Sequence, residues 1–320
     1  MEKEIKLITY NIDGLPETLD LADLPWILKP IAWIYKLIKG TTVIRINDNC
    51  DTEKHINHIS ECLKKSDADI IGVQEDFNYH DNLMSSLSGD YDDSTYQGGF
   101  DLSKIFSNTE WLTYFPLPRF KCDGLNLITK KDRIRLNDED INTWDKSYGF
   151  FTHANDLLTH KGFRYYPLTI DKDINIDVYV LHMDADFYNV NTCPDVDGDI
   201  EARRDQLNQL TRYILDRYER GNNSPIIIMG DTNSSVNYQW DVDNINECLL
   251  TPINALLSMT IEEVVPSNKR DVDRLFMVNN ARSRYQLEGV KCFYDESFNE
   301  EIGRVSDHKP LITTIKIQLK

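Results

Sequence analysis

The chain has 320 residues, of which 41% are apolar and 28% charged, a composition typical of a globular protein that can bury a sizeable core. Its formal net charge of -18, from 35 basic and 53 acidic residues, repels polyanions and disfavours a long nucleic acid as partner. Bound divalent cations would cancel part of this charge locally, so nucleic-acid chemistry stays open as an alternative.

The cysteines and the chain start restrict the class of protein further. No Cys-x-x-Cys pair occurs, which argues against a zinc knuckle and a redox motif; we expect mostly buried thiols, at Cys50, Cys62, Cys122, Cys193, Cys248 and Cys292. No apolar stretch approaches the roughly 18 residues that span a bilayer. The first residues show no leader pattern, so we expect a cytoplasmic protein or a secreted one whose leader has been removed.

Predicted strands alternate along the chain with predicted helices. Apolar runs predict strands at 5–10, 69–73, 124–129, 163–170, 174–183, 225–229, 273–278 and 311–319. Amphipathic spacing predicts helices at 53–66, 200–219 and near 246–258. The alternation indicates an α/β fold, and the lack of a linker rich in Pro, Gly or Ser predicts that residues 1–320 form a single domain.

Residues 24–39 interrupt this alternation. They combine two tryptophans, a tyrosine and aliphatic residues with three lysines, which suits an interfacial segment that contacts a membrane surface. The alternative is a helix that covers part of the core. Pro30 interrupts the segment, which is also too short to span a membrane.

Polar residues stand at the ends of several predicted strands. Carboxylate and amide oxygens are the ligands that hard cations such as magnesium, manganese or calcium prefer, and imidazoles without a nearby Cys fit metal-assisted hydrolysis of a phosphoester. The residues concerned are Asn11, Glu75, His182, Asp231, Asn233, Asp307 and His308. Each has a simpler explanation when it is taken alone: a turn, a surface carboxylate, or a helix cap.

Seven short motifs occur in an order that resembles the endonuclease/exonuclease/phosphatase superfamily. They are Thr9-Tyr10-Asn11, Val73-Gln74-Glu75, Asp123-Gly124-Leu125, Val180-Leu181-His182, Gly230-Asp231-Thr232-Asn233, Asp273-Arg274-Leu275 and Ser306-Asp307-His308-Lys309-Pro310. Each is weak by itself, but together they span residues 7 to 315. The resemblance implies two packed, mainly antiparallel β-sheets flanked by helices, a four-layer αββα sandwich.

The resemblance also implies a role for each polar residue. Glu75 would be the principal ligand of a Mg²⁺ ion, with Mn²⁺ or Ca²⁺ as alternatives, while Asn11 and Asp307 contact the metal or its surroundings. Asp231 would orient or deprotonate the attacking water and Asn233 would hold the phosphate. A protonated histidine would stabilise the negative charge that develops, and His182 would stabilise the transition state. His308 would bind a phosphate oxygen or help activate water, with Asp273 fixing its tautomer; alternatively, Asp273 pairs with Arg274 or Arg270.

The substrate is less defined than the reaction. Two stretches resemble neutral sphingomyelinase-like members of the superfamily, Asn11–Pro16 and His182–Asn189. With the net charge and residues 24–39, they favour a metal-dependent phosphodiesterase of the sphingomyelinase C type, acting as a monomer. The alternatives are a nuclease or an inositol or nucleotide phosphatase on the same fold, and a catalytically silent binding module.

Three further stretches carry weaker expectations. Asp195–Asp199 is expected to be a solvated acidic loop rather than a calcium site, and His55 and His58 are expected to be exposed. Lys161, in His160-Lys161-Gly162-Phe163, lies in a stretch that resembles a family segment near the substrate phosphate. Asn126 departs from the small apolar residue that many members have there.

Overall fold

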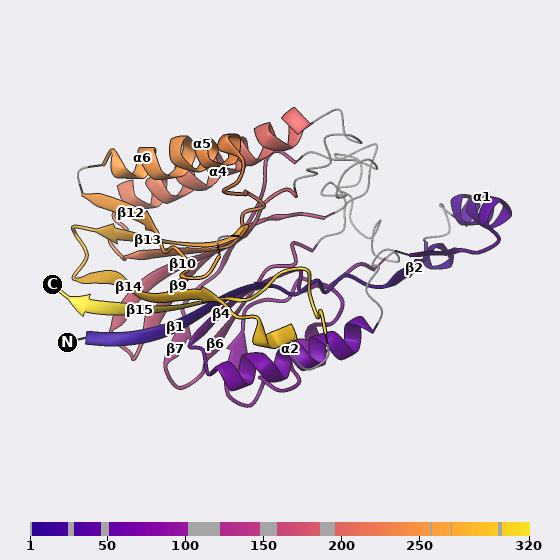
Figure 1. The fold of residues 1–320 in the computed structure, drawn as a ribbon, viewed down its shortest axis with the longest axis horizontal. Helices are drawn as coiled ribbons and strands as arrows, with labels where there is room; N and C mark the ends of the chain where they lie inside the picture. Colours follow the sequence, from indigo (N-terminus) through magenta and orange to yellow (C-terminus); the bar gives the residue numbers. More distant parts are fainter. Residues whose placement is uncertain are drawn as a thin grey trace.

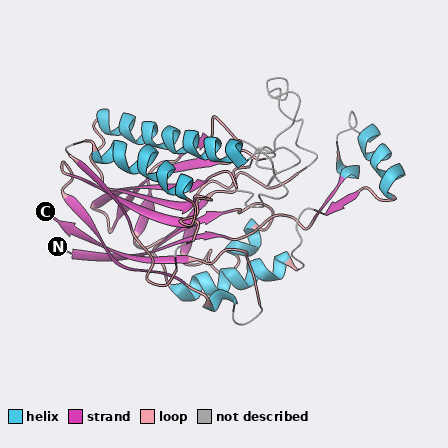
Figure 2. Ribbon diagram, turned by 45° about the horizontal axis from the view of Figure 1, so that its top comes forward, coloured by secondary structure: helices cyan, strands magenta, loops and turns pink. Residues whose placement is uncertain are grey.

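The computed structural model describes residues 2–24, 29–45, 51–101, 122–147, 159–185, 196–256, 258–269, 271–299 and 303–320. Two large sheets pack face to face and helices cover both outer faces (Figures 1 and 2). Within these sheets β1–β4 and β10–β11 are parallel pairs, whereas the other pairs are antiparallel. The predicted αββα sandwich is therefore confirmed.

The first sheet has the strand order β14-β15-β1-β4-β6-β5. Its strands are β1 (Glu2–Asn11), β4 (Ile70–Gln74), β5 (Tyr91–Asp93), β6 (Asn126–Lys130), β14 (Tyr285–Tyr294) and β15 (Leu311–Leu319). Helices α2 (Thr52–Ser66) and α3 (His80–Met84) and the 3₁₀ turn η6 (Ser297–Asn299) cover its outer face. The apolar stripe of α2, Ile56, Ile59 and Leu63, is fully buried there, as its spacing predicts.

The second sheet has the strand order β12-β13-β11-β10-β9-β7, and β8 also pairs with β9. Its strands are β7 (Ile134–Leu136), β8 (Asp140–Thr143), β9 (Gly162–Ile170), β10 (Ile174–His182), β11 (Ile226–Asp231), β12 (Met259–Glu263) and β13 (Asp273–Asn280). The outer layer consists of α4 (Val196–Glu219), α5 (Gln239–Ile245), a π-helical turn (Asn246–Leu250) and α6 (Thr251–Asn254).

The π-helical turn has a local cause in Pro252. Proline has no N–H, so it cannot donate to the carbonyl oxygen of Cys248, four residues earlier. Thr211 on α4 donates its hydroxyl to that oxygen instead, at 2.7 Å. The outer helices are thus joined where the proline interrupts the regular ladder.

The main core lies between the sheets and consists of inward-facing residues of both. Gly72 on β4 packs directly against the second sheet, because a Cβ added there would lie 2.7 Å from Met229 Cε and 3.1 Å from Val180 Cγ2. A side chain at this position would push the sheets apart. The close packing fixes the distance between the strand ends described below.

Residues 12–45 leave the sandwich as an arm that ends in α1 (Figure 1). The arm consists of β2 (Thr18–Asp20), the 3₁₀ turn η1 (Leu21–Asp23), α1 (Lys29–Lys39) and β3 (Val43–Arg45), and β2 pairs with β3. The alternative that residues 24–39 cover the core is therefore wrong for α1. No helix in the described part of the chain has the length and apolar content that a membrane span needs.

Two smaller expectations are also wrong. His58 is buried rather than exposed, because α2 turns it toward η6, where its Nε2 lies 3.1 Å from the carbonyl oxygen of Phe298. Residues 196–199 form the first turn of α4 instead of a solvated loop, and Asp199 is buried; residue 195 lies outside the described residues. Acidic residues are favoured in the first turn of a helix, so Asp197 and Asp199 suit this helix start.

We expect Gly72→Ala to lower the free energy of unfolding by about 1–3 kcal/mol, because the added methyl group overpacks the core at Met229. Gly89→Ala is the matched control, since nothing lies within 4 Å of a Cβ there. Urea unfolding of both variants measures the difference. Met229→Leu should restore part of the loss in the double variant; a Gly72→Ala protein as stable as the parent would contradict the packing argument.

Candidate active site

Strand register brings the predicted polar residues to one end of the sandwich. In the first sheet, Asn11 at the end of β1 pairs with Gln74 at the end of β4, directly before Glu75. In the second sheet, His182 pairs with Asp231, and Asp231 pairs with Asp273 at the start of β13. The chain termini lie at the opposite end of the sheets (Figure 1).

Asn11 connects the two sheets at this end. Its Nδ2 donates to Glu75 Oε1 at 3.0 Å and to Asp231 Oδ2 at 3.1 Å. Ser306 holds the same strand end from a third segment, because its hydroxyl donates to the carbonyl oxygen of Asn11 at 2.8 Å. Asn11 is buried, so these are bonds of the protein interior and not of a surface turn.

Asp231 lies between two imidazoles. Its Oδ2 is 3.5 Å from His182 Nε2 and 3.6 Å from His308 Nε2. Gly230 precedes it with a φ of +148°, and a Cβ there would lie 2.0 Å from the carbonyl oxygen of Leu181. Only glycine therefore fits at this position of the strand.

Asn233 is oriented by the same strand end. Its backbone N–H donates to Asp231 Oδ1 at 2.8 Å, and its Nδ2 donates to the carbonyl oxygen of Met183 at 3.0 Å. The backbone of Asn233 is left-handed, with a φ of +47°, a conformation that asparagine tolerates well. Asn233 is thus both a turn residue and a residue of the candidate site.

His308 and Asp273 form a buried pair. Nδ1 of His308 lies 2.8 Å from Asp273 Oδ2, so Nε2 is the nitrogen that faces Asp231. Burial lowers the pKa of His308, but the carboxylates of Asp273 and Asp231 outweigh it and hold that pKa well above its ordinary value. His308 is therefore an imidazolium at neutral pH. Of the alternative partners of Asp273, Arg274 donates to Ser234 and Glu263, and Arg270 lies outside the described residues.

His182 has the opposite electrostatic environment. Burial, with the charges of Lys161 and His308, holds its pKa well below the ordinary value, so the ring is neutral. A neutral ring can still donate one hydrogen bond through Nε2, whereas the buried Nδ1 has no hydrogen-bond partner among the described residues.

Glu75 has a strained backbone, with a φ of +60°. Two N–H groups hold it in place, because its carbonyl oxygen accepts from Gly14 at 3.1 Å and from Phe77 at 2.9 Å. The strain turns the carboxylate toward Asn11 and His182, whose Nε2 lies 3.9 Å from Glu75 Oε1. Backbone strain of this kind often occurs at functional sites.

Excess negative charge surrounds Glu75. Burial raises its pKa to about 7; Lys161 opposes this shift, while Asp13 and Asp307 add to it. Three carboxylates facing one ammonium group form an oxygen-rich site that a hard divalent cation would neutralise. Glu75, Asn11 and Asp307 therefore fit a magnesium-type ion in donor chemistry, and Asp307 lies at the exposed rim.

Asp231, Asp273 and His308 also lie close enough together to bind an ion, since their donor atoms fall within 4.8 Å of one another. However, Nδ1 of His308 is already engaged by Asp273, and the ring is charged. A protonated imidazole cannot bind a metal. In this charge state the trio is less suited to a cation than the carboxylate of Glu75.

Lys161 is a site residue that the sequence indicates only through its resemblance to a family segment near the substrate phosphate. It is buried just before β9, and its Nζ lies 3.4 Å from the carbonyl oxygen of Met183, next to the bond that Asn233 makes. Its charge influences both Glu75 and His182. A buried ammonium group at this place is suited to contact a phosphate.

A polar network behind Glu75 was missed. Asp76 Oδ2 accepts from Asn126 at 2.9 Å and lies 2.7 Å from His80 Nδ1, whose Nε2 faces Asp93 at 3.1 Å. The unusual residue Asn126 thus has a partner in Asp76. No local sequence pattern links these four positions, because they meet only in the folded sheet.

The Asp123-Gly124-Leu125 motif is structural. Both carboxylate oxygens of Asp123 accept from the buried guanidinium of Arg164 at 2.6 Å. Gly124 has a φ of +66°, and its carbonyl oxygen accepts from the N–H of Asp76 at 2.9 Å. The motif supports the loop that carries Glu75 and does not enter the site.

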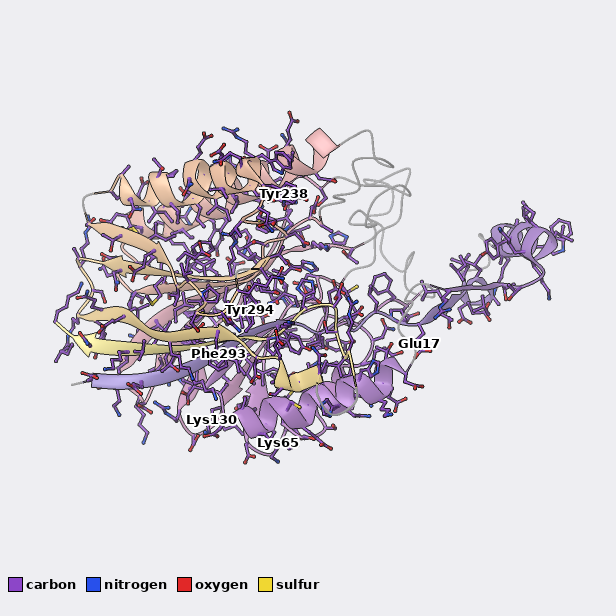
Figure 3. All side chains as sticks on the ribbon, in the orientation of Figure 1. Glu17, Lys65, Lys130, Tyr238, Phe293 and Tyr294 are labelled. Carbon is purple, nitrogen blue, oxygen red and sulfur yellow. The ribbon has the colours of Figure 1, made fainter. Side chains whose placement is uncertain are left out.

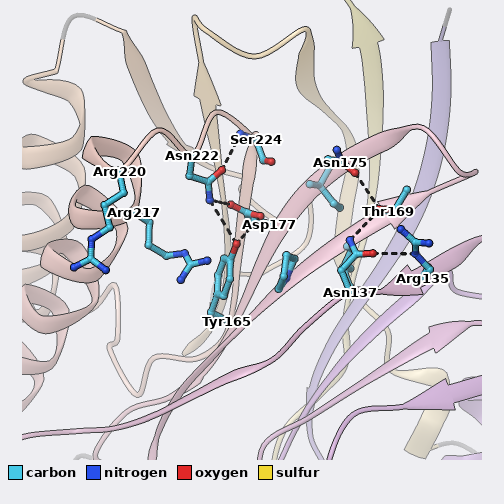
Figure 4. A pocket seen from close by; sticks show the side chains of 13 residues that line it. Arg135, Asn137, Tyr165, Thr169, Asn175, Asp177, Arg217, Arg220, Asn222 and Ser224 are labelled. Carbon is cyan, nitrogen blue, oxygen red and sulfur yellow. Dashed lines mark hydrogen bonds between the residues drawn. The ribbon is translucent and has the colours of Figure 1, made fainter.

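A pocket of about 590 Å³ lies elsewhere, around Asp177 on β10 (Figure 4). Asp177 precedes His182 by five positions, which places it roughly 16 Å away along the strand. Its carboxylate accepts from Tyr165 at 3.0 Å and also from Asn222. Burial raises the pKa of Asp177 to about 6, but its oxygens have partners, so this pocket does not compete with the strand-end site.

Comparison with known proteins identifies the fold independently. The profile described as the Endonuclease/Exonuclease/phosphatase family matches residues 8–308. No curated protein sequence matches.

Three solved structures are similar over almost the whole chain. Sphingomyelinase C from Streptomyces griseocarneus is 14% identical with a TM-score of 0.58, covering 98% of this chain and 99% of that one. A beta toxin mutant from Staphylococcus aureus with bound magnesium ions is 14% identical with a TM-score of 0.56, covering 99% and 100%. D. rerio TDP2 complexed with a single-strand DNA product is 12% identical with a TM-score of 0.59, covering 98% of both chains.

We expect Mg²⁺ to raise the melting temperature more at pH 8 than at pH 6. The pKa of Glu75 is raised to about 7, so its protonated form stabilises the fold, and this contribution is lost as the pH rises through 7. Magnesium binds the deprotonated form; below pH 7 it must displace the proton, which weakens binding by up to about tenfold per pH unit. Thermal scans with and without Mg²⁺ measure this. Glu75→Gln is the control, whose melting temperature should respond little to Mg²⁺. An equal Mg²⁺-induced shift of the parent's melting temperature at both pH values would contradict Glu75 as the metal ligand.

Proposed function

Because the chain belongs to the endonuclease/exonuclease/phosphatase family, we propose that it is a magnesium-dependent phosphodiesterase that hydrolyses a phospholipid of the sphingomyelin type. The observation that carries the reaction class is the joining of Glu75 and Asp231, from different sheets, by the single amide of Asn11, with both imidazoles facing Asp231. A silent binding module would have no need of this arrangement.

The metal would be held by Glu75, with Asn11 and Asp307 beside it. When bound, it would neutralise charge on the phosphate and on the leaving oxygen. The beta toxin structure with bound magnesium supports this choice of ion. The pKa of Glu75 supports it from within the chain, because a cation would relieve the excess of carboxylates there.

Asp231 would take the proton of the attacking water. It is the carboxylate at the centre of the site, and its second oxygen is fixed by the N–H of Asn233. The water oxygen forms a bond to phosphorus as the bond from phosphorus to the lipid oxygen breaks. That leaving oxygen takes up a proton from solvent, and Asp231 returns its own proton to solvent after turnover. The products are a phosphorylated headgroup and a lipid alcohol.

The two histidines would act differently on the phosphate. His308, an imidazolium held by Asp273, supplies positive charge and a donor at Nε2. The positive charge of His308 therefore favours phosphate binding, rather than activation of water, as the role of this residue. His182 is neutral and would donate one hydrogen bond to an oxygen that gains charge in the transition state. Asn233 and Lys161 would hold the remaining phosphate oxygens.

The choice of a lipid substrate has separate support. The sphingomyelinase C and TDP2 structures resemble this chain equally well, with TM-scores of 0.58 and 0.59, so likeness of fold does not separate lipid from DNA. The net charge of -18 disfavours DNA. The stretches Asn11–Pro16 and His182–Asn189 favour the lipid, although residues 186–189 lie outside the described residues.

We expect Asp231→Asn to lower kcat by on the order of 10³-fold while the melting temperature stays nearly unchanged, because the base is lost and the shape is kept. Asp177→Asn is the matched control, a buried carboxylate of the neighbouring strand whose loss should leave kcat within about threefold. Turnover of a soluble chromogenic phosphodiester measures both. An Asp231→Asn enzyme that keeps a tenth of the activity would contradict the role.

We expect turnover of sphingomyelin with Mg²⁺, none with EDTA, and little turnover of plasmid DNA or an inositol phosphate. Phosphate-bearing products, separated by chromatography, measure each reaction in parallel. Activity on DNA alone would overturn the lipid proposal but keep the metal-dependent chemistry. No turnover of any phosphoester would favour a binding module instead.

A further inference from the structure

Helix α1 exposes large apolar side chains on one face. Trp33, Ile34, Leu37 and Ile38 are 63%, 50%, 65% and 73% exposed. Single exposed apolar residues are common on proteins, but four neighbours on one helix are not. Their exposure is unfavourable in water, so the face is suited to a partner that removes it from water.

The arrangement on the helix is amphipathic. Trp33 and Leu37 are four residues apart, as are Ile34 and Ile38, so these four side chains form one continuous stripe. Ala32 is buried on the other side, where α1 faces η1. Lys36 borders the stripe, and Lys39 projects from the opposite side of the last turn; both are exposed. Bulky apolar residues bordered by lysines are typical of helices that lie in a membrane interface.

The charge of this region is opposite to that of the chain. Although the chain has 53 acidic residues, none occurs between Asp23 and Asp48, the longest such interval, which contains Lys29, Lys36, Lys39 and Arg45. The acidic residues of the arm, Asp13, Glu17, Asp20 and Asp23, all precede α1. A basic tip on an acidic protein favours an anionic surface as its partner.

The arm holds this tip at the end of the molecule that carries the site. β1 ends in Asn11 and continues directly into the arm, away from both termini (Figure 1). Glu17 lies at the neck of the arm in Figure 3, and its carboxylate accepts from the N–H of Thr52 at the start of α2, at 3.0 Å. Leu19 and Leu21 pack against a cluster that includes Phe77, two residues after Glu75.

We propose that the apolar stripe of α1, defined by Trp33, Ile34, Leu37 and Ile38, docks on an anionic lipid bilayer, with Lys36 and Lys39 at the headgroups. The excess negative charge of the chain lies outside this segment, so the basic tip is the part that an anionic surface attracts. Docking itself is independent of the enzyme's chemistry; that it delivers substrate to Asp231 rests on the proposed function.

A second copy of the chain could also cover the stripe. The four lysine and arginine side chains of one arm would then face those of its partner, which is unfavourable for two like-charged helices. The anionic bilayer satisfies both the apolar stripe and the basic flank. An anionic bilayer is therefore the better partner for the stripe, and the test below also detects self-association.

The test is co-sedimentation of the full chain with phosphatidylcholine vesicles that contain 20% or no phosphatidylserine. We expect binding with phosphatidylserine, at least about tenfold weaker binding without it, and a similar loss when the four stripe residues are changed to Ser. Lys36→Glu with Lys39→Glu should remove the preference for phosphatidylserine. The matched control is Val265→Ser with Val290→Ser, two exposed apolar residues outside the arm, which should bind as the parent does.

The depth to which α1 enters the bilayer and the turnover of substrate are measured in separate experiments. Brominated lipids should quench part of the tryptophan fluorescence of the parent, and Trp33→Phe should bind but lose that quenching. All arm variants should keep the parent's turnover of a soluble phosphodiester. No vesicle binding by the parent, or a stripe-dependent dimer in sedimentation velocity, would overturn the proposal. Loss of soluble turnover in all proteins, including the parent, would instead overturn the proposed function and leave docking intact.

Discussion

The site depends on one amide nitrogen. Nδ2 of Asn11 bonds Glu75 of one sheet loop and Asp231 of the other sheet, so two carboxylates that would repel each other share a donor between them. This contact requires the sheets to approach closely, which Gly72 permits at Met229 and Val180. It also requires parallel registers in β1–β4 and β10–β11, because these bring the carboxyl ends of the strands to one place.

Around this contact the protein separates two kinds of electrostatic environment. Carboxylates collect at Glu75, where burial, with smaller contributions from Asp13 and Asp307, raises the pKa to about 7 although Lys161 opposes the shift. Asp273 and Asp231 instead keep His308 charged, while burial and two neighbouring cations keep His182 neutral. One histidine thus supplies charge and the other a neutral donor, although both stand at strand ends beside the same aspartate. Burial and partners, rather than residue type, set their chemistry.

The sequence predicted the central strands of both sheets and the helices at α2 and α4, because their apolar periodicity is strong. It missed the strands at the sheet edges, β5, β7, β8, β12 and β14, which are short or, like β14, mostly exposed. It could not predict the charge states of His182 and His308, which depend on neighbours distant in the chain. Nor could it place Asn126 against Asp76 and His80, a contact made between separate segments. Composition detected residues 24–39 as unusual, but whether α1 covers the core or projects from it depends on how the arm leaves β1.

The central claim is that Glu75 binds the metal whereas the His308–Asp273 pair handles charge and protons. A crystal structure of the protein with Mn²⁺, with anomalous diffraction locating the ion, tests this division directly. We predict an anomalous peak within coordination distance of the Glu75 carboxylate, with His308 Nδ1 still bonded to Asp273. A peak coordinated by Asp231, Asp273 and His308 together, with that hydrogen bond broken, would contradict it.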